Sequence, residues 1–329
     1  MSTRSGGPLP LTGSGARFGF ACFALALGGW SLGAASGAGS EVGTAPSVTQ
    51  LADQPDTAGS GPLPGASAGQ DLPFIPYVTQ PSPRLQELMR RDFLDDYESN
   101  VVYGYRIVTE TERYASRYSG NRLRCTNCHL NGGTQPDGMP LNIAGMYPQW
   151  RSKNGVRNGI GLRIRECFLY SLDGIMPPED APEVLAVAAY IHFLSEGEVI
   201  GERPEGAGVP TLPETGLDPN PARGEVVFEQ TCVACHGSDG RGTELAPPLW
   251  GPESYNAGAG MSRIEKAAGF IWANMPYQMG RTLSHQQAFD VAAYLNLQLR
   301  PSDPRDGRLR KLFEKVIRRV AGWFGGDAA

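Results

Sequence analysis

Two Cys-x-x-Cys-His motifs constrain this chain more than any other feature. They read Cys125-Thr-Asn-Cys128-His129 and Cys232-Val-Ala-Cys235-His236. In each motif the two thiols lie one helical turn apart, where both can bond to one porphyrin, and the adjacent imidazole then faces the iron. Zinc knuckles, the alternative, need four ligands per metal at another spacing. The motifs therefore predict two covalently attached c-type haems.

The remaining cysteines and the charge narrow the class further. The chain has 329 residues, enough for about two domains, and a net charge of −5, which argues against a nucleic-acid partner. Of its six cysteines, four belong to the motifs and Cys22 lies in an apolar N-terminal run. Cys167 is left without a partner. Such a thiol is either an iron ligand or a small buried residue.

The N-terminal residues predict export. Basic residues precede an apolar run from Phe18 to Trp30, and small residues follow it, which is the pattern of a secretory signal. We therefore expect a signal peptide over residues 1–38 and a periplasmic protein, with an uncleaved membrane anchor as the alternative. Residues 39–81 are rich in Gly, Ala, Ser, Pro and Thr, which predicts a flexible linker.

The rest of the chain contains a duplication. A Val-Ala-Ala-Tyr segment follows each haem motif, ending at Tyr190 and at Tyr294. The two segments are separated by nearly the same number of residues as the two motifs. This spacing predicts two copies of one helical unit. Strand patterns are weak throughout, so we expect an all-α fold.

Capping residues predict where several helices begin. Ser82 with Pro83, and Asn220 with Pro221, are typical helix starts, and Ser284 begins a capping box. In the first of these helices, Leu85, Leu88, Met89 and Phe93 recur at helical spacing.

Gly224 and Phe228 lie four residues apart on one expected helix, where glycine permits close crossing and Tyr294 is a natural aromatic partner. This pattern resembles class I cytochrome c domains, in which the first and last helices cross beside the haem. It implies two tandem domains, each around one haem. For the reasons given below, we expect the first haem to serve catalysis and the second to serve electron transfer. The expected division is residues 82–200 and 220–300, with a linker over 201–219 and a basic amphipathic helix over 301–329.

Each haem iron needs a second axial ligand, or stays open. For the second haem we favour Met275, which Pro276 holds extended, over Met279 and Met261. For the first haem two candidates remain open, Met176 and Cys167. We interpret the other two histidines, His192 and His285, as ordinary helix residues.

Basic residues gather around the first motif. Between residues 122 and 165 the only acid is Asp137, and the basic residues are Arg122, Arg124, Arg151, Lys153, Arg157, Arg163 and Arg165. Positive charge lowers the pKa of a thiol and favours the thiolate as a ligand, which supports Cys167 over Met176. Some of these residues pair with haem propionates or face solvent, but the full cluster indicates a small anionic substrate.

Several motifs resemble the dihaem cytochrome c thiosulfate dehydrogenases. They are Cys125-Thr-Asn-Cys-His-Leu-Asn-Gly-Gly, Tyr147-Pro-Gln-Trp-Arg151, Ser171-Leu-Asp-Gly174, Leu249-Trp-Gly-Pro252, Gly258-Ala-Gly-Met261 and Asn274-Met275-Pro276, together with Arg163 and Cys167. The resemblance spans roughly residues 82–300. It implies His129 and Cys167 on the first haem iron, His236 and Met275 on the second, and a substrate site near Arg163 and Ser171. One position departs, since Ile175 stands where such enzymes often carry a basic residue.

The resemblance implies oxidation of thiosulfate to tetrathionate, with the preferred direction left open. Arg163, with Arg151 or Lys153, would offset the repulsion between two dianions, and the sulfur of Cys167 would carry a sulfur adduct. We expect electrons to pass from the first haem to the second and then to an external acceptor, such as another cytochrome c. The alternative function is a non-catalytic dihaem electron carrier with Met176 and Met275 as ligands.

A third interpretation, a membrane-docked subunit of a redox complex, depends on the C-terminal residues. An apolar stripe there is flanked by basic residues: Leu309, Leu312, Phe313, Val316, Ile317, Val320 and Phe324, with Arg308, Arg310, Lys311, Lys315, Arg318 and Arg319. Such a helix either lies on an anionic membrane or docks on a protein surface, including that of its own domain.

Overall fold

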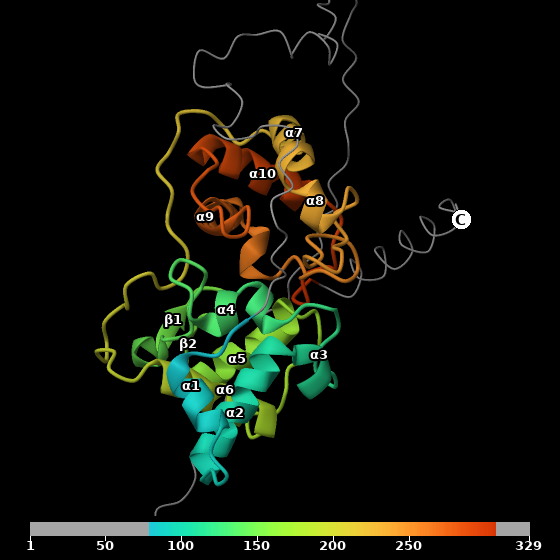
Figure 1. The fold of residues 1–329 in the computed structure, drawn as a ribbon. Helices are drawn as coiled ribbons and strands as arrows, with labels where there is room; N and C mark the ends of the chain where they lie inside the picture. Colours follow the sequence, from blue (N-terminus) through green and yellow to red (C-terminus); the bar gives the residue numbers. More distant parts are fainter. Residues whose placement is uncertain (1–78, 307–329) are drawn as a thin grey trace, which may run out of the picture. The chain divides into compact units, whose positions relative to one another are not determined.

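The computed structural model describes residues 79–306 (Figure 1). The expected signal peptide over 1–38, all but the last residues of the linker over 39–81, and the stretch from 307 to 329 of the expected C-terminal helix lie outside the described residues. Within 79–306, no helix combines the length and the hydropathy that crossing a bilayer requires.

Almost all of the regular secondary structure in the described residues is helical, as predicted. Residues 82–200 are here called the N-terminal half and residues 220–306 the C-terminal half. The N-terminal half contains α1 (Pro83–Met89), α2 (Asp96–Thr109), α3 (Thr111–Tyr114), α4 (Leu130–Gly133), α5 (Ile160–Tyr170) and α6 (Pro182–Leu194). The C-terminal half contains α7 (Pro221–Thr231), α8 (Val233–His236), α9 (Ile264–Asn274) and α10 (His285–Leu297). Single 3₁₀ turns cover Cys125–Asn127, Ala144–Met146 and Gly260–Ser262.

The predicted helix starts are confirmed. The side chain of Ser82 accepts a hydrogen bond from the Leu85 amide at the start of α1, and Asn220 caps α7. Ser284 and Gln287 form the expected capping box of α10. The first helix is shorter than its apolar spacing predicts. Helix α1 ends at Met89, and Phe93, which was expected on the same helix, lies beyond it and is 91 % exposed.

The C-terminal half is organised around the crossing of α7 and α10, as predicted. A Cβ on Gly224 of α7 would lie 2.0 Å from the carbonyl oxygen of Asp290 on α10, so only glycine allows this approach. The Phe228 ring lies 5.5 Å from Tyr294 and 5.1 Å from Trp250, between ring centroids. The N-terminal half has a similar close crossing of two helices. A Cβ on Gly104 of α2 would lie 2.1 Å from the Ala186 carbonyl oxygen on α6.

Replacing Gly224 by alanine is expected to destabilise the protein by about 3 kcal/mol or more, since the new methyl group meets backbone that cannot move aside cheaply. Denaturant unfolding of the haem-loaded protein measures the loss. Gly260→Ala is the matched control, because a Cβ there meets nothing within 4 Å, and its cost should stay within about 0.5 kcal/mol. Equal unfolding midpoints for Gly224→Ala and the unchanged protein would contradict the close crossing.

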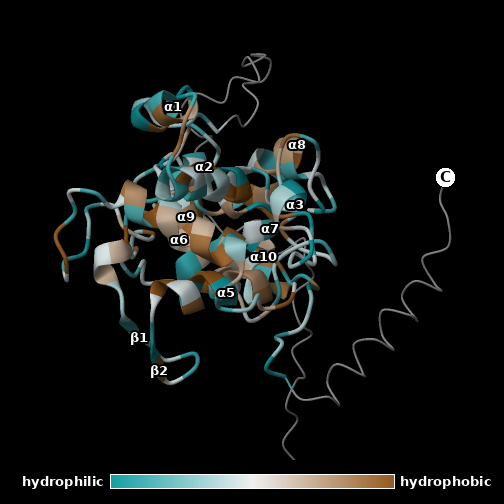
Figure 2. Ribbon diagram, turned by 90° about the horizontal axis from the view of Figure 1, so that it is seen from below, coloured by the Kyte–Doolittle hydropathy of each residue, from teal (hydrophilic) through white to brown (hydrophobic). Residues whose placement is uncertain are grey.

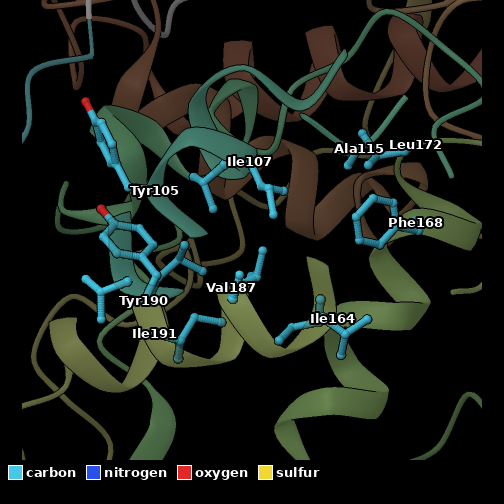
Figure 3. Packing of buried hydrophobic residues seen from close by; sticks show 14 of the residues in the cluster. Tyr105, Ile107, Ala115, Ile164, Phe168, Leu172, Val187, Tyr190 and Ile191 are labelled. Carbon is cyan, nitrogen blue, oxygen red and sulfur yellow. The ribbon is translucent and has the colours of Figure 1, made fainter. Parts of the chain in front are cut away.

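Each half contains a cluster of buried apolar side chains, and the N-terminal cluster also takes in Tyr255 and Ala259 of the C-terminal half. In the N-terminal half the cluster lies between α2, α5 and α6, where Tyr105 faces Tyr190 at 5.7 Å between ring centroids (Figure 3). Phe168 lies beside Ala115 and Leu172, and Ile164 of α5 belongs to the same cluster as Val187 and Ile191 of α6 (Figure 3). In both halves hydrophobic residues concentrate on the helices, while the connecting loops are largely hydrophilic (Figure 2).

A short antiparallel hairpin interrupts the helical fold. Strand β1 covers Gln149–Arg151 and β2 covers Val156–Asn158, with Trp150 opposite Arg157. Asn158 is fully buried and, like Asn154, donates to the carboxylate of Glu166 on α5, at 2.9 and 2.8 Å. These bonds fix the hairpin to the helix that carries Cys167.

The first residues of the expected linker pack on the N-terminal half. The amide of Asp137 donates to the Gly206 carbonyl and the amide of Met139 to the Gly208 carbonyl, each at 2.9 Å. The amide of Gly201 donates to Gly145 in the same way. Residues 201–208 therefore form part of the wall of this half.

Candidate active site

One cavity in the N-terminal half collects most of the predicted site residues. Its polar lining includes Cys125, Cys128, His129, Cys167, Arg163, Arg151 and Ser171. Its apolar lining comes mainly from the buried cluster and includes Val108, Leu123, Leu141, Ile164, Phe168 and Val187. Residues far apart in the sequence thus converge on one space with a polar side and an apolar side.

Helix α5 presents three of these residues because of its period. Arg163, Cys167 and Ser171 follow one another at intervals of four residues, so they share one helix face. Ser171 caps the helix, and its amide donates to the Cys167 carbonyl at 2.9 Å. All three line the cavity. The sequence spacing therefore accounts directly for the arrangement of a cation, a thiol and a hydroxyl.

His129 is held by a backbone carbonyl group. Its Nδ1 lies 2.6 Å from the carbonyl oxygen of Met139. A ring nitrogen that donates to a carbonyl fixes the orientation of the imidazole and makes Nε2 the nitrogen that can bind a metal, which is the usual support of a histidine ligand. Met139 itself has a left-handed backbone, with φ of 53°. This carbonyl contact was not predicted from the sequence, because nothing in the Met139 side chain signals it.

The surroundings of Cys167 favour the thiolate. Burial raises the pKa of this thiol, but the Arg163 guanidinium and a hydrogen bond with His129 lower it more, to about 7. The charge on the sulfur in turn raises the pKa of Arg163, although burial of the guanidinium opposes that shift. Arg163 also hydrogen-bonds with the Tyr147 side chain. The thiol and the guanidinium therefore act as a coupled pair, with Tyr147 beside them.

The predicted basic cluster is only partly assembled here. Arg124, Arg151 and Arg163 line the cavity. Arg165 turns away and donates through Nε to the Pro177 carbonyl at 2.7 Å. The ammonium of Lys153, which was expected to bind substrate, donates to the Gly258 carbonyl and lies 4.0 Å from the centroid of the Tyr170 ring.

Arg122 and Arg157 do not line the cavity either. Arg122 donates to the Arg241 carbonyl at 3.4 Å, and the exposed Arg157 donates to the Pro148 carbonyl at 3.5 Å. Residues close together in the sequence thus diverge in space, so the cavity keeps three of the seven basic side chains.

Arg203 is a site residue that sequence reasoning missed. It lines the same cavity and donates to the Ala207 carbonyl in the packed part of the linker. One signal was available, because Arg203 is the only basic residue between positions 201 and 219. The cavity therefore draws positive charge from a segment that belongs to neither predicted domain.

Two residues that were singled out from the sequence lie outside the cavity lining. Met176, the alternative ligand for the first haem, is 36 % exposed in the loop after α5. Ile175, the position that departs from the family pattern, is 61 % exposed. The departure at Ile175 therefore leaves the lining of the cavity unchanged.

The second motif has a related arrangement. Cys232 and His236 bracket α8, and Nδ1 of His236 lies 2.8 Å from the Pro247 carbonyl oxygen. Burial lowers the pKa of His236, which favours the neutral, ligating form of the ring. Cys232 and Met275 pack against the same apolar cluster. Cys235 is exposed.

The rival ligands of the C-terminal half differ from one another. Met279 is 46 % exposed, whereas Met261 packs against the apolar clusters of both halves. His192 is exposed on α6, and the His285 ring stacks edge-on against Trp272, with 5.0 Å between centroids. Met275 combines partial burial with a place on the cluster that also holds Cys232.

These donor sets fit a covalently attached haem. The first cavity brings together two thiols for attachment, an imidazole whose Nδ1 is already engaged, and an apolar wall of the kind that packs against a porphyrin. The second motif has the same thiols and the same tethered imidazole.

Comparison with known proteins agrees with this assignment. Residues 221–298 match the cytochrome c family. A thiosulfate dehydrogenase of Thiomonas intermedia is 42 % identical over 217 residues, which cover 64 % of this chain and 69 % of that protein. A thiosulfate dehydrogenase of Stutzerimonas stutzeri is 40 % identical, covering 64 % and 70 %. The chain belongs to the thiosulfate dehydrogenase family. Membership in this cytochrome family means that the chain carries covalent c-type haem.

A solved structure extends the comparison. The thiosulfate dehydrogenase TsdBA from Marichromatium purpuratum, in its as-isolated form, superposes with a TM-score of 0.62 and 34 % sequence identity. The match covers 76 % of this chain but only 56 % of the solved chain. The match thus includes most of this chain, but this chain corresponds to little more than half of the solved chain.

Proposed function

We propose that this protein is a dihaem thiosulfate dehydrogenase that joins two thiosulfate ions into tetrathionate. The observation that carries the proposal is the convergence of Cys167, Arg163 and the first attachment motif on one cavity. A plain electron carrier has no need of a thiol beside a guanidinium, and Met176, which that alternative requires, lies outside the lining. Family membership supports the same reaction.

The ligand sets belong to the proposal. They are His129 and Cys167 for the first iron, and His236 and Met275 for the second. When bound, the two haems would supply one-electron redox chemistry that links the substrate to an external acceptor such as another cytochrome c. The residues around the first cavity supply the rest, since they bind the anion, offset its charge and position the reacting sulfur.

The substrate chemistry explains why the cavity is basic. Two dianions repel each other, so positive groups must face both of them in the transition state. Arg163 and Arg151 line the cavity and suit this role. Lys153 is not part of this proposal, because its ammonium already contacts the Gly258 carbonyl and the Tyr170 ring. Ser171 offers a hydroxyl on the same helix face.

A balanced sequence uses Cys167 as the nucleophile. The thiolate and the terminal sulfur of one thiosulfate form a sulfur–sulfur bond with release of two electrons, which gives a cysteine S-sulfonated persulfide. The terminal sulfur of the second thiosulfate then attacks the sulfane sulfur of this adduct. The bond to Cys167 breaks, tetrathionate leaves, and the thiolate is regenerated without proton transfer.

Location and organisation complete the proposal. Export to the periplasm is supported by the N-terminal charge and hydropathy pattern. We keep the division into domains at residues 82–200 and 220–300, with residues 201–219 between them. Contact of residues 301–329 with a membrane or a partner also stays a proposal.

Steady-state assays of the haem-loaded protein test the proposed reaction. With thiosulfate and an artificial one-electron acceptor, we expect one tetrathionate for every two electrons transferred. The reverse reaction, with tetrathionate and a reduced donor, determines the preferred direction. Reduction of the haems by other donors, without any tetrathionate formed from thiosulfate, would refute the enzyme and leave the electron carrier.

A further inference from the structure

Asn274 joins the two halves immediately before Met275. It is the last residue of α9, and its side chain is only 2 % exposed. Its amide nitrogen donates to the carbonyl oxygens of Asp137 and Phe270, each at 3.0 Å. Its amide oxygen accepts from Nε2 of Gln135 at 2.8 Å. Both polar ends of this buried amide therefore have partners in the loop of residues 135–139.

The same loop orients His129. The carbonyl of Met139 accepts the hydrogen bond from Nδ1 of the histidine at 2.6 Å. Asp137 and Met139 both have left-handed backbones, with φ of 59° and 53°. One carbonyl of the loop thus contacts the imidazole of the N-terminal half, and another contacts the residue before Met275.

Packing around the loop leaves little freedom. Leu130, Val209 and Phe270 form a buried cluster, against which both Met139 and Met275 pack. An added Cβ on Gly138 would lie 3.3 Å from the amide oxygen of Asn274. Arg281 pairs with the Asp137 carboxylate at 2.6 Å on the exposed side. Displacing the loop would therefore disturb contacts with both halves.

We propose that Asn274 is a positioning residue, which holds Met275 in place by binding the loop that also orients His129. The inference rests on the proposed ligand set, in which Met275 binds the second iron. A thioether is a weak, uncharged ligand, so its occupancy depends on how firmly the backbone presents it. Partners in the second coordination sphere of metal ligands typically change affinity by about 10–100-fold.

Competition with added imidazole measures how firmly Met275 is held. Thioether-bound ferric haem has a far-red absorption band, and imidazole removes that band by displacing the sulfur. For Asn274→Ala we expect the half-displacing imidazole concentration to fall about tenfold, and the midpoint potential of the methionine-ligated haem to fall as well. Gln135→Ala removes one of the three hydrogen bonds of the Asn274 side chain, and Gln135 is less buried than Asn274. This variant should therefore shift the imidazole concentration and the potential in the same direction, but by less.

Asn256→Ala provides the matched control. Asn256 is a fully buried asparagine whose amide donates to the Leu169 carbonyl at 2.8 Å and to the Asp173 carboxylate at 2.9 Å. It therefore links the two halves as Asn274 does, but away from Met275. We expect its imidazole titration to match the unchanged protein. An equal shift in Asn256→Ala would overturn the proposal, because general loosening between the halves would then explain the effect.

Met275→Ala separates this inference from the ligand assignment. Loss of the far-red band in that variant supports Met275 as the ligand. If the band is lost there, while Asn274→Ala and Gln135→Ala titrate like the unchanged protein, the positioning role is wrong and the ligand assignment stands. If Met275→Ala keeps the band, both are overturned.

Discussion

Replacing Cys167 by glycine is expected to leave both haems attached and to lower thiosulfate turnover by about 1000-fold or more. Attachment depends on the thiols of the two motifs, which the change does not touch. In the proposed mechanism turnover depends on the sulfur of Cys167, which lies on the cavity face of α5, next to Arg163. Steady-state rates of tetrathionate formation, with haem content from absorbance, measure the two effects separately.

Met176→Leu is the control for this prediction. The Met176 side chain lies outside the cavity lining and is partly exposed, so this variant should keep its turnover and its near-infrared spectrum. The thiolate signature of the first haem should disappear only in Cys167→Gly. Full turnover of Cys167→Gly, or loss of activity in Met176→Leu alone, would refute the catalytic role of the thiol.

Replacing Arg163 by glutamine should lower kcat/KM for thiosulfate by about 100-fold. In the proposed mechanism the guanidinium offsets the charge of both dianions. It also lowers the pKa of the Cys167 thiol, which should rise toward its ordinary value when the cation is lost. Arg163→Lys keeps the charge without the planar pair of donors, and should recover part of the rate. Steady-state kinetics of both variants measure this difference.

Arg165→Gln is the matched control, because it removes the same charge from the same helix. Arg165 donates to the Pro177 carbonyl and lies 3.8 Å from the carboxylate of Glu179, outside the cavity lining. Its effect on kcat/KM should stay within about threefold, the scale of a screened surface charge. Equal losses in the two arginine variants would mean that net charge alone matters, and would contradict a specific site at Arg163.

Features that depend on adjacent residues could be predicted from the sequence. The helix caps at Ser82, Asn220 and Ser284 are hydrogen bonds between residues close in the sequence. The residue types at these positions therefore predict them. The crossing at Gly224 was visible because an aromatic lies one turn away. The hairpin was missed, since strands of three residues are too short to show alternation. Phe93 was misassigned because periodicity does not say where a helix ends.

The site was harder to predict than the fold, for geometric reasons. Arg163 and Arg165 are two positions apart on a helix, so they face nearly opposite directions, and only one lines the cavity. Lys153 lies in the hairpin turn, whose direction the sequence does not reveal. Carbonyl groups such as those of Met139 and Pro247 have no residue-type signal at all. Arg203 lies in a Gly- and Pro-rich segment where no site was expected.

The segment from Gly201 to Gly208 has a consequence for how this architecture can be rearranged. It hydrogen-bonds to the N-terminal half along its length and contributes Arg203, Ala207 and Gly208 to the cavity. A truncation at residue 200, or a chimaera joined there, would therefore open one side of the pocket although every predicted catalytic residue were kept. A domain exchange that keeps the cavity closed must therefore carry residues 201–208 together with the N-terminal half.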